Sequence, residues 1–447
     1  MSLIKKRVVI TFLLIFFNSV VPISASHSVG TGVCTSTVNS STGVVVTNNG
    51  GYCYVAFTAT GGNSWTAPVG ISSVDLLIIA GGGAGGGGAW GGGGGAGEVV
   101  LQTIYAVSSS SATSLTVGDG GTPGTASLTA SANRSNPGGN SWVGSASGVV
   151  AQGGGAGASY AYGDVSSYSV GGNGGSGGGG TENTVTNTGG SSTKTSSGNR
   201  TGYGNNGGRG GPGGSTQSGG GGGGAGGAGT DAGTAIGGNG GGGTNAFATW
   251  LSAINPGMSG ITNWQTATST GYIAGGGGGG TTTTAGTAGA GGAGRGGSNS
   301  TFYNGESAVA NTGSGGGGSS YGGTARTGGM GSSGLIVIRY ATVTTTVNSF
   351  NLTGNATTAT YRAPSTININ VNTPSKVTFK ARGVVITGCK NKAATGSGSS
   401  YSATCSWRPS IRGQVNLIAD IVPTGPWANT TSTPLSIRVS NRSGARA

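Results

Sequence analysis

Short runs of β-branched and aliphatic residues alternate along this chain with long stretches that carry almost no large side chains. Residues 76–80 and 99–107 have the length and composition of buried strands, and they frame a segment of almost only glycine and alanine, 81–97. Glycine tracts of this kind recur until residue 334, where a further strand-like run, 335–340, begins. We therefore expect these three strands to share one sheet, with the glycine tracts as its insertions.

Weaker alternation marks strands on both sides of this region. Residues 44–57 form a predicted hairpin with its turn at 48–51, and residues 142–152 are a further strand candidate. After a linker at 341–349, apolar and polar residues alternate at short spacing through 350–447, which is typical of a small β-sandwich. No amphipathic helix longer than two turns is evident, so the sequence predicts an all-β protein.

Glycine supplies 105 of the 447 residues, and its tracts are either flexible linkers or an ordered array. Each ordered glycine loses about 1–2 kcal/mol of backbone entropy, so an isolated tract should stay loose. Side by side in the polyproline II conformation, such tracts can approach closely because no Cβ intervenes, and their amides can bond to neighbouring tracts. The 12 prolines are too few for collagen. We therefore expect a bundle of short polyglycine II helices inserted in a β-sandwich, with aromatic segments as loops at its ends.

The N-terminus has the features of a secretory signal peptide. Cations at positions 5–7 precede an apolar run, 8–17, that is too short to span a bilayer comfortably, and small residues at 24–26 offer a cleavage site. The alternative is an uncleaved membrane anchor. We expect a secreted or cell-surface protein with no transmembrane segment after cleavage. The expected division is a signal peptide at 1–25, a glycine-rich domain at 26–340, a linker at 341–349 and a basic domain at 350–447.

Export makes the four cysteines informative. Cys34 lies close to Cys53 along the chain, and Cys389 lies close to Cys405. We expect these two local disulfides, because more than 300 residues separate the pairs, and we expect the first of them to hold the hairpin at 44–57. Loops of this length gain about 3 kcal/mol in entropic models. Zinc binding is the alternative, but no CxxC motif or nearby histidine supports it, so no metal or cofactor is expected.

The formal net charge of +13 is unevenly distributed. Residues 27–344 carry equal numbers of basic and acidic residues, whereas residues 345–447 carry eleven cations against Asp420 alone. Anionic wall polymers, acidic polysaccharide or a phospholipid surface are plausible partners after export, although a basic face can also serve solubility alone. No nucleic-acid-binding motif appears. The candidate anionic-polymer contacts are Lys376, Lys380, Arg382, Lys390, Lys392, Arg408 and Arg412.

The segments that frame the glycine region, residues 65–74, 76–80, 92–98 and 331–340, resemble the glycine-rich domain of bacterial and phage surface proteins. The layout of about residues 52–340 is also similar to the glycine-rich region of anaplastic lymphoma kinase-type receptors and to phage tail-fibre tip adhesins. In those families a β-sandwich carries a polyglycine II bundle, and loops at one end of the adhesin bundle contact a receptor. The resemblance implies adhesion or recognition by analogy. Phage adhesins lack a cleaved signal, which favours a bacterial exported protein here.

The C-terminal segment resembles bacterial Ig-like repeats, on residues 376–379, the turn at Gly383 and residues 413–419. Such modules usually act as stalks or adhesive spacers. The complete fold prediction is therefore an all-β chain: a β-sandwich with an inserted polyglycine II helix bundle, followed by a C-terminal Ig-like β-sandwich.

Catalysis finds little support in the residue types. His27, beside the expected cleavage site, is the only histidine, so histidine-based triads and zinc–histidine sites are effectively excluded. No P-loop motif occurs, and the eight acidic residues are scattered. A carboxylate pair for glycoside hydrolysis has no motif to support it. We expect a protein that is not an enzyme.

The aromatic residues between the glycine tracts are the candidate ligand contacts, although each could instead cap the bundle. They are Tyr160, Tyr162, Tyr168, Phe247, Trp250, Trp264, Phe302 and Tyr303. The sequence favours adhesion or recognition of an unidentified glycan or protein ligand through these loops. A structural envelope or extracellular-matrix protein without a specific ligand is the alternative. Ice binding is less well supported, because no regular threonine ladder lines one face.

Overall fold

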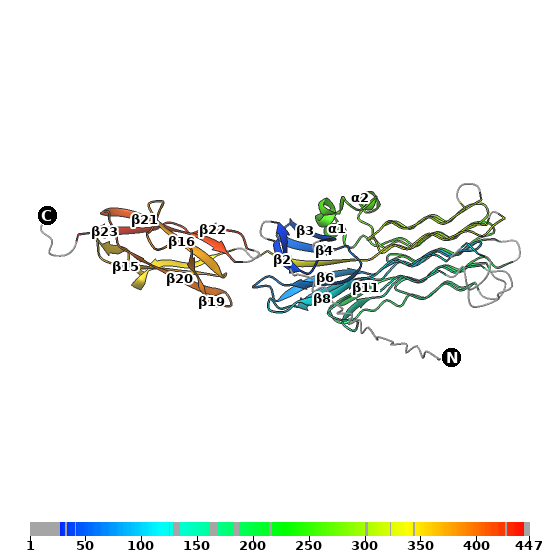
Figure 1. Ribbon diagram of the computed structural model, residues 1–447, viewed down its shortest axis with the longest axis horizontal. Coiled ribbons are helices and arrows are strands. Elements are labelled where there is room, and N and C mark those ends of the chain that lie inside the picture. Colours follow the sequence, from blue (N-terminus) through cyan, green and yellow to red (C-terminus); the bar gives the residue numbers. More distant parts are fainter. Residues whose placement is uncertain are drawn as a thin grey trace, which may run out of the picture.

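The computed structural model describes residues 27–31, 34–40, 42–124, 126–127, 135–160, 169–182, 187–213, 217–299, 303–321, 323–342, 345–424 and 427–441. These residues form two β-sandwiches placed end to end, with a long bundle of extended segments projecting from the first (Figure 1). The predicted signal peptide lies outside the described residues. The predicted all-β class is confirmed.

Two six-stranded sheets form the N-terminal sandwich. In spatial order the first contains β1 (His27–Thr31), β2 (Cys34–Val38), β5 (Gly61–Thr66), β8 (Thr113–Val117), β9 (Ser141–Val143) and β10 (Val149–Ala151). The second contains β11 (Arg200–Tyr203), β7 (Val99–Ala106), β6 (Ser73–Ile79), β12 (Leu335–Ala341), β4 (Tyr52–Phe57) and β3 (Val44–Asn49). The three strands predicted to share a sheet are therefore neighbours, with β6 between β7 and β12. The single strand expected at 142–152 is instead the short pair β9 and β10.

Strand β6 is apolar on both faces because it separates two cores. Leu76 and Ile78 face the core between the sheets, while Leu77 and Ile79 face a second core on the outer side. Three short helices cover that outer core: α1 (Ala248–Ile254), η1 (Asn255–Met258) and α2 (Trp264–Ala267). A strand buried on both faces reads as a continuous apolar run, which is why 76–80 stands out in the sequence.

The predicted pairing of the first two cysteines is confirmed, but its role differs from the prediction. Cys34 lies on β2 and Cys53 on β4, so the bond joins the two sheets across the core. The hairpin of β3 and β4 is closed by its own backbone ladder. The disulfide therefore fixes one sheet on the other.

The glycine tracts are inserted between the strands of this sandwich. They leave it between β6 and β7, between β8 and β9, between β10 and β11, and between β11 and β12. All of them extend from the same end of the sandwich and run side by side (Figure 1). The bundle is thus a set of elongated connections between strands that are already paired.

The tract 91–97 lies at the centre of the bundle. Because polyglycine II has three residues per turn, successive N–H groups point to three different neighbours. The N–H groups of Gly91, Gly94 and Gly97 donate to the carbonyl oxygens of Ser319, Gly316 and Gly313. Those of Gly92 and Gly95 donate to Ala158 and Gly155, and those of Gly93 and Ala96 donate to Gly220 and Gly223, all at 2.8–2.9 Å. Every third amide therefore bonds to the same neighbouring tract.

The carbonyl oxygens of this tract repeat the pattern with other neighbours. The carbonyl oxygens of Gly91 and Gly94 accept the N–H groups of Gly280 and Gly277. Those of Gly92 and Gly95 accept from Gly86 and Gly83, and those of Gly93 and Ala96 accept from Gly179 and Ser176, all at 2.7–2.9 Å. The central tract is thus surrounded on all sides by other tracts. The prediction of a polyglycine II bundle is confirmed.

This packing leaves no space for side chains. A Cβ added to Gly93 would lie 2.0 Å from the carbonyl oxygen of Gly277, and one added to Gly94 would lie 2.1 Å from that of Gly83. Real Cβ atoms essentially never approach another atom within 3.0 Å. The glycines are therefore required by the distance between the tracts, because each backbone occupies the volume that a Cβ of its neighbour would need.

Glu98 follows the central tract and is completely buried where the bundle meets the sandwich. Its carboxylate accepts the backbone N–H groups of Gln152 at 2.9 Å and Thr195 at 2.8 Å, and Nη2 of Arg200 lies 3.5 Å away. Burial raises the pKa of Glu98, and these partners oppose that rise. One carboxylate thus ties together segments that enter the bundle from β7, β10 and β11.

The C-terminal sandwich is built from a four-stranded and a seven-stranded sheet. One contains β13 (Val347–Leu352), β15 (Ser365–Val371), β20 (Ser400–Trp407) and β19 (Thr395–Ser397), with η2 (Thr353–Asn355) after β13. The other contains β14 (Thr358–Thr360), β23 (Leu435–Ser440), β21 (Gly413–Pro423), β16 (Ser375–Ala381) and β17 (Val384–Val385), with β18 (Lys392–Ala393) beside β16 and β22 (Thr430–Thr431) beside β21. The predicted disulfide between Cys389 and Cys405 is confirmed. The segment between the domains is shorter than the expected linker, since β12 ends at Ala341 and β13 begins at Val347.

The two sandwiches touch at a glycine. Gly70, with a φ of +88°, lies in the turn before β6, and a Cβ there would lie 2.3 Å from Cζ2 of Trp427. The buried indole of Trp427 therefore lies directly on the bare backbone of Gly70. Directly after β12, the N–H of Thr342 donates to the carbonyl of Gly51 at 2.8 Å.

Candidate functional site

The distal end of the bundle, farthest from the sandwich, is closed by aromatic side chains. Trp90, in the turn between tracts 81–88 and 91–97, has a φ of +45° and is buried. The rings of Tyr160 and Tyr321 meet it edge-on, with centroids 4.9 and 5.5 Å from that of the indole. The hydroxyl of Thr181 donates to the backbone oxygen of Trp90 at 2.5 Å. Three separate insertions are thereby joined at this end.

A second aromatic residue at the distal end is open to solvent. Tyr303 is 42% exposed, and the guanidinium of Arg326 lies 4.5 Å from the centre of its ring. Arg326 is held in place by two backbone hydrogen bonds exchanged with Gly88, at 2.8 and 2.9 Å. We call Trp90, Tyr160, Tyr303, Tyr321 and Arg326 the distal cluster. It combines flat apolar surface with a cation, which suits contact with a glycan or a protein side chain.

Glu182 lies close to this cluster, directly after Thr181. Its side chain is 5% exposed; one carboxylate oxygen accepts the backbone N–H of Gln217, and Oε2 has no hydrogen-bond partner among the described residues. Burial raises the pKa of Glu182 above its ordinary value of 4.5. The charged form is therefore disfavoured in the folded protein.

This environment predicts how Glu182→Gln acts. When folding raises the pKa of a carboxyl group, that group lowers the free energy of unfolding as the pH rises above its pKa in the unfolded chain. Glu182→Gln is therefore expected to raise the melting temperature at pH 7, and the gain should shrink as the pH falls towards 4.5. Thermal melts across this range measure the effect, with the exposed Glu306→Gln as the control. A variant that is less stable than the wild type at pH 7 would contradict this interpretation of Glu182.

The structure corrects part of the predicted aromatic site. Phe247, Trp250 and Trp264 are buried in the outer core, on α1 and α2 or next to them, and the ring of Trp250 meets that of Tyr54 edge-on at 5.8 Å. Their prediction as ligand contacts is wrong, because their apolar surfaces pack against the outer face of the second sheet. Tyr162, Tyr168 and Phe302 lie outside the described residues.

Tyr160 and Tyr303 do lie at the distal end, in the cluster described above. Sequence reasoning missed Trp90, Tyr321 and Arg326 as members of that cluster. The usable signal is position: each lies in a turn between two consecutive glycine tracts, and such turns must lie at an end of the bundle.

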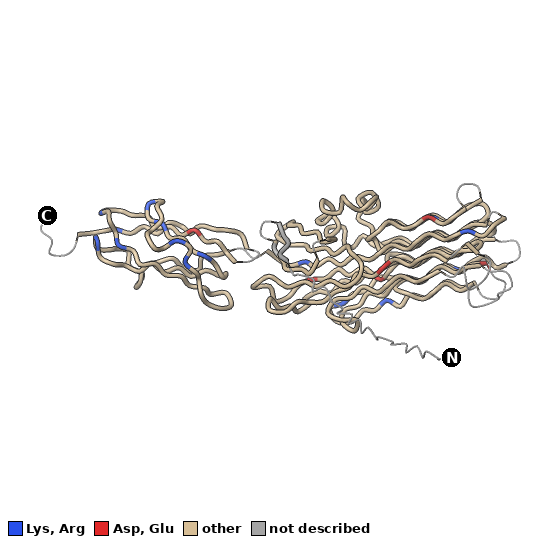
Figure 2. The backbone as a smooth tube through the Cα atoms, viewed as in Figure 1, with Lys and Arg blue, Asp and Glu red and all other residues tan. Residues whose placement is uncertain are grey.

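The predicted basic residues separate into two groups. Lys376 and Lys380 lie on β16, and Lys392 lies beside them because β18 pairs with β16; Lys390 precedes β18. Arg382, Arg408 and Arg412 lie in the loops after β16 and β20. Figure 2 shows cations spread over the C-terminal sandwich, whereas charges are sparse in the bundle. The seven predicted residues therefore lie on different elements of the C-terminal sandwich, some on strands and some in loops.

Two further features of the described residues bear on the kind of site. No group of three or more His, Cys, Asp or Glu residues is placed to hold a metal ion in the described part of the chain. Across the same residues, no helix has the length and apolar character needed to cross a membrane.

Comparison with known proteins adds one finding. A family model described as a glycine-rich domain matches residues 57–341, which is more than half of the chain. The match runs from the end of β4 to the end of β12, so it covers the bundle and leaves the C-terminal sandwich outside. The comparison with curated proteins found no match.

Proposed function

Since the chain belongs to the glycine-rich domain family, we propose that it is a non-enzymatic secreted or cell-surface protein that recognises a glycan or protein ligand through the distal end of its bundle. The observation that carries this proposal is the distal cluster. The bundle places Tyr303 and Arg326 far from both sandwiches, on a support whose backbone is hydrogen-bonded throughout its centre. Rigid presentation reduces the ordering cost of binding.

Export is part of the proposal. The two disulfide bonds support it, because such bonds form and persist in oxidising compartments. The sequence of the N-terminus, with cations at 5–7 before an apolar run, supports it independently. A structural envelope or matrix protein would share both features, so binding has to distinguish the two functions.

Tyr303→Ala supplies that distinction. We expect it to weaken binding of the purified protein to bacterial cells or to a glycan array by about 10-fold or more, as truncating an aromatic anchor does. Tyr52→Ala is the matched control, since Tyr52 is 39% exposed and has Arg339 at 4.8 Å from its ring, but lies at the start of β4 beside the domain junction. Equal binding by the two variants, or no binding by the wild type, would favour the structural alternative.

A further inference from the structure

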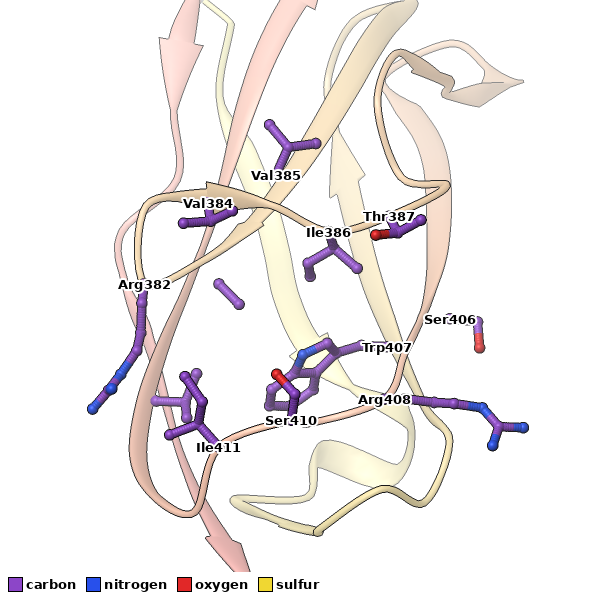
Figure 3. Close-up of a pocket in the computed structure, with 12 residues that line it drawn as sticks. Arg382, Val384, Val385, Ile386, Thr387, Ser406, Trp407, Arg408, Ser410 and Ile411 are labelled. Carbon is purple, nitrogen blue, oxygen red and sulfur yellow. The ribbon is translucent and has the colours of Figure 1, made fainter.

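A cavity of about 680 Å³ opens in the C-terminal sandwich, between the loop after β16 and the segment after β20 (Figure 3). Trp407 lies at its centre, with Ile386 on one side and Ser410 and Ile411 on the other. This volume is within the usual range of small-molecule sites, about 300–1,000 Å³. The family match ends at residue 341, so nothing in it assigns a role to this cavity.

Strand β17 and the segment after β20 expose large apolar side chains at the cavity. Val384 is 71% exposed and Ile411 is 46% exposed, and Val385 is also exposed. All three line the cavity, so their exposed surfaces are grouped at one place rather than scattered. An apolar group of this kind rimmed by polar residues marks an interaction site.

Arginines flank this apolar group. Arg382 and Arg408 lie on opposite sides of the cavity with their guanidinium groups directed outwards (Figure 3). Arg412 follows Ile411 in the chain, and its guanidinium lies 4.7 Å from the ring centre of Tyr361. The one acidic residue between 345 and 447, Asp420, bonds to Lys380 at 2.5 Å. These arginines therefore have no carboxylate side chain of their own domain to pair with.

The cavity lies at the end of the sandwich opposite the glycine-rich domain. Strand β15 pairs its last residue, Val371, with Val347, the first residue of β13 after the domain junction. Its first residue, Ser365, pairs with Trp407. Trp407 and the domain junction are thus at opposite ends of one strand, and the glycine bundle lies beyond the junction (Figure 1).

We propose that this end of the protein binds a membrane surface rich in anionic phospholipid, with an acyl chain in the cavity and lipid phosphates on Arg382, Arg408 and Arg412. Arginine binds phosphate through paired hydrogen bonds, and apolar side chains beside cations are typical of membrane-surface binding. A soluble anionic polymer would use the cations but leave Val384, Val385 and Ile411 in water. The proposal is independent of what the distal cluster recognises, so either can fail alone.

Vesicle co-sedimentation tests it, using residues 26–447 so that the apolar run at 8–17 is absent. The wild type is expected to bind phosphatidylglycerol–phosphatidylcholine vesicles at low salt and not phosphatidylcholine vesicles. The double variant Val384→Ser with Ile411→Ser should bind the anionic vesicles at least about 10-fold more weakly than the wild type. Val422→Ser is the matched control, because Val422 is an exposed valine at the other end of β21. This variant should bind the vesicles as the wild type does.

Charge variants complete the test. Arg382→Gln with Arg408→Gln should weaken vesicle binding more than Lys390→Gln with Lys392→Gln, which removes the same charge away from the cavity. Dextran sulfate binding serves as a control for folding and net charge, and the Val384–Ile411 variant should retain it. Equal vesicle binding by that variant and the wild type would show that charge alone acts and would overturn the proposal. So would no binding of the wild type to anionic vesicles.

Discussion

Gly93→Ala is expected to destabilise the bundle severely. The added Cβ would lie 2.0 Å from the carbonyl oxygen of Gly277 and 2.9 Å from the amide nitrogen of Gly222, both backbone atoms that no rotamer change can move. Relief requires the tract to shift, which breaks the bonds from Gly93 to Gly220 and from Gly179 to Gly93. We expect a loss of more than about 4 kcal/mol in the free energy of unfolding, as for other severe backbone conflicts.

The matched control is Gly242→Ala. Gly242 lies in another tract of the same bundle, is exposed, and has no atom within 4 Å of the position that a Cβ would take. Alanine there should be neutral or stabilising by up to about 1 kcal/mol, because it restricts the unfolded chain. In thermal unfolding, the melting temperatures of the two variants should differ by about 10 °C or more. Similar stability for both would mean that the tracts are not as close as the structure places them.

The sheet scaffold is readable from the sequence because its strands carry side chains with a clear pattern. Residues 76–80, 99–107 and 335–340 are dense in β-branched and aliphatic residues, and they become β6, β7 and β12 of one sheet. The C-terminal alternation predicts strands for the same reason, since one face of each strand is buried in the core.

The neighbours of each glycine tract are not readable in this way. Gly93 bonds to Gly220 and Gly179, whereas Gly94 bonds to Gly316 and Gly277. Both glycines lie inside the same run of glycines, 91–95, so the local sequence does not indicate which tract each one contacts. Side chains normally specify which segments meet, and polyglycine has none. The conformation of the tracts follows from general physics, whereas their order in the bundle depends on where the scaffold strands release and recover the chain.

The aromatic residues show a further limit. Trp250 and Trp264 lie between glycine tracts, as Trp90 does, and the sequence pattern treats all such aromatics as loop residues. The segment 248–267 instead forms short helices on the outer face of the second sheet and buries both indoles. Helices this short have too few turns to show an amphipathic period, so the fate of their aromatics depends on tertiary packing.

The basic residues were predicted from net charge, which carries no position. Strand alternation places Lys376 and Lys380 on β16, whereas loops place Arg382 and Arg408 on either side of the cavity. The exposed Val384 and Ile411 give the second location its distinct chemistry, and they are inconspicuous in a sequence where valine and isoleucine usually mark strands.

Amide hydrogen exchange tests the central claim, that side-chain-free tracts form a rigid solid, most directly. The amides of residues 91–97 bond to three neighbouring tracts and lie inside the bundle, so they should exchange only when the bundle opens. We expect rates about 10⁴-fold or more below those of unstructured polyglycine, given ordinary folding stabilities. Exchange at the unstructured rate across these residues would contradict the account.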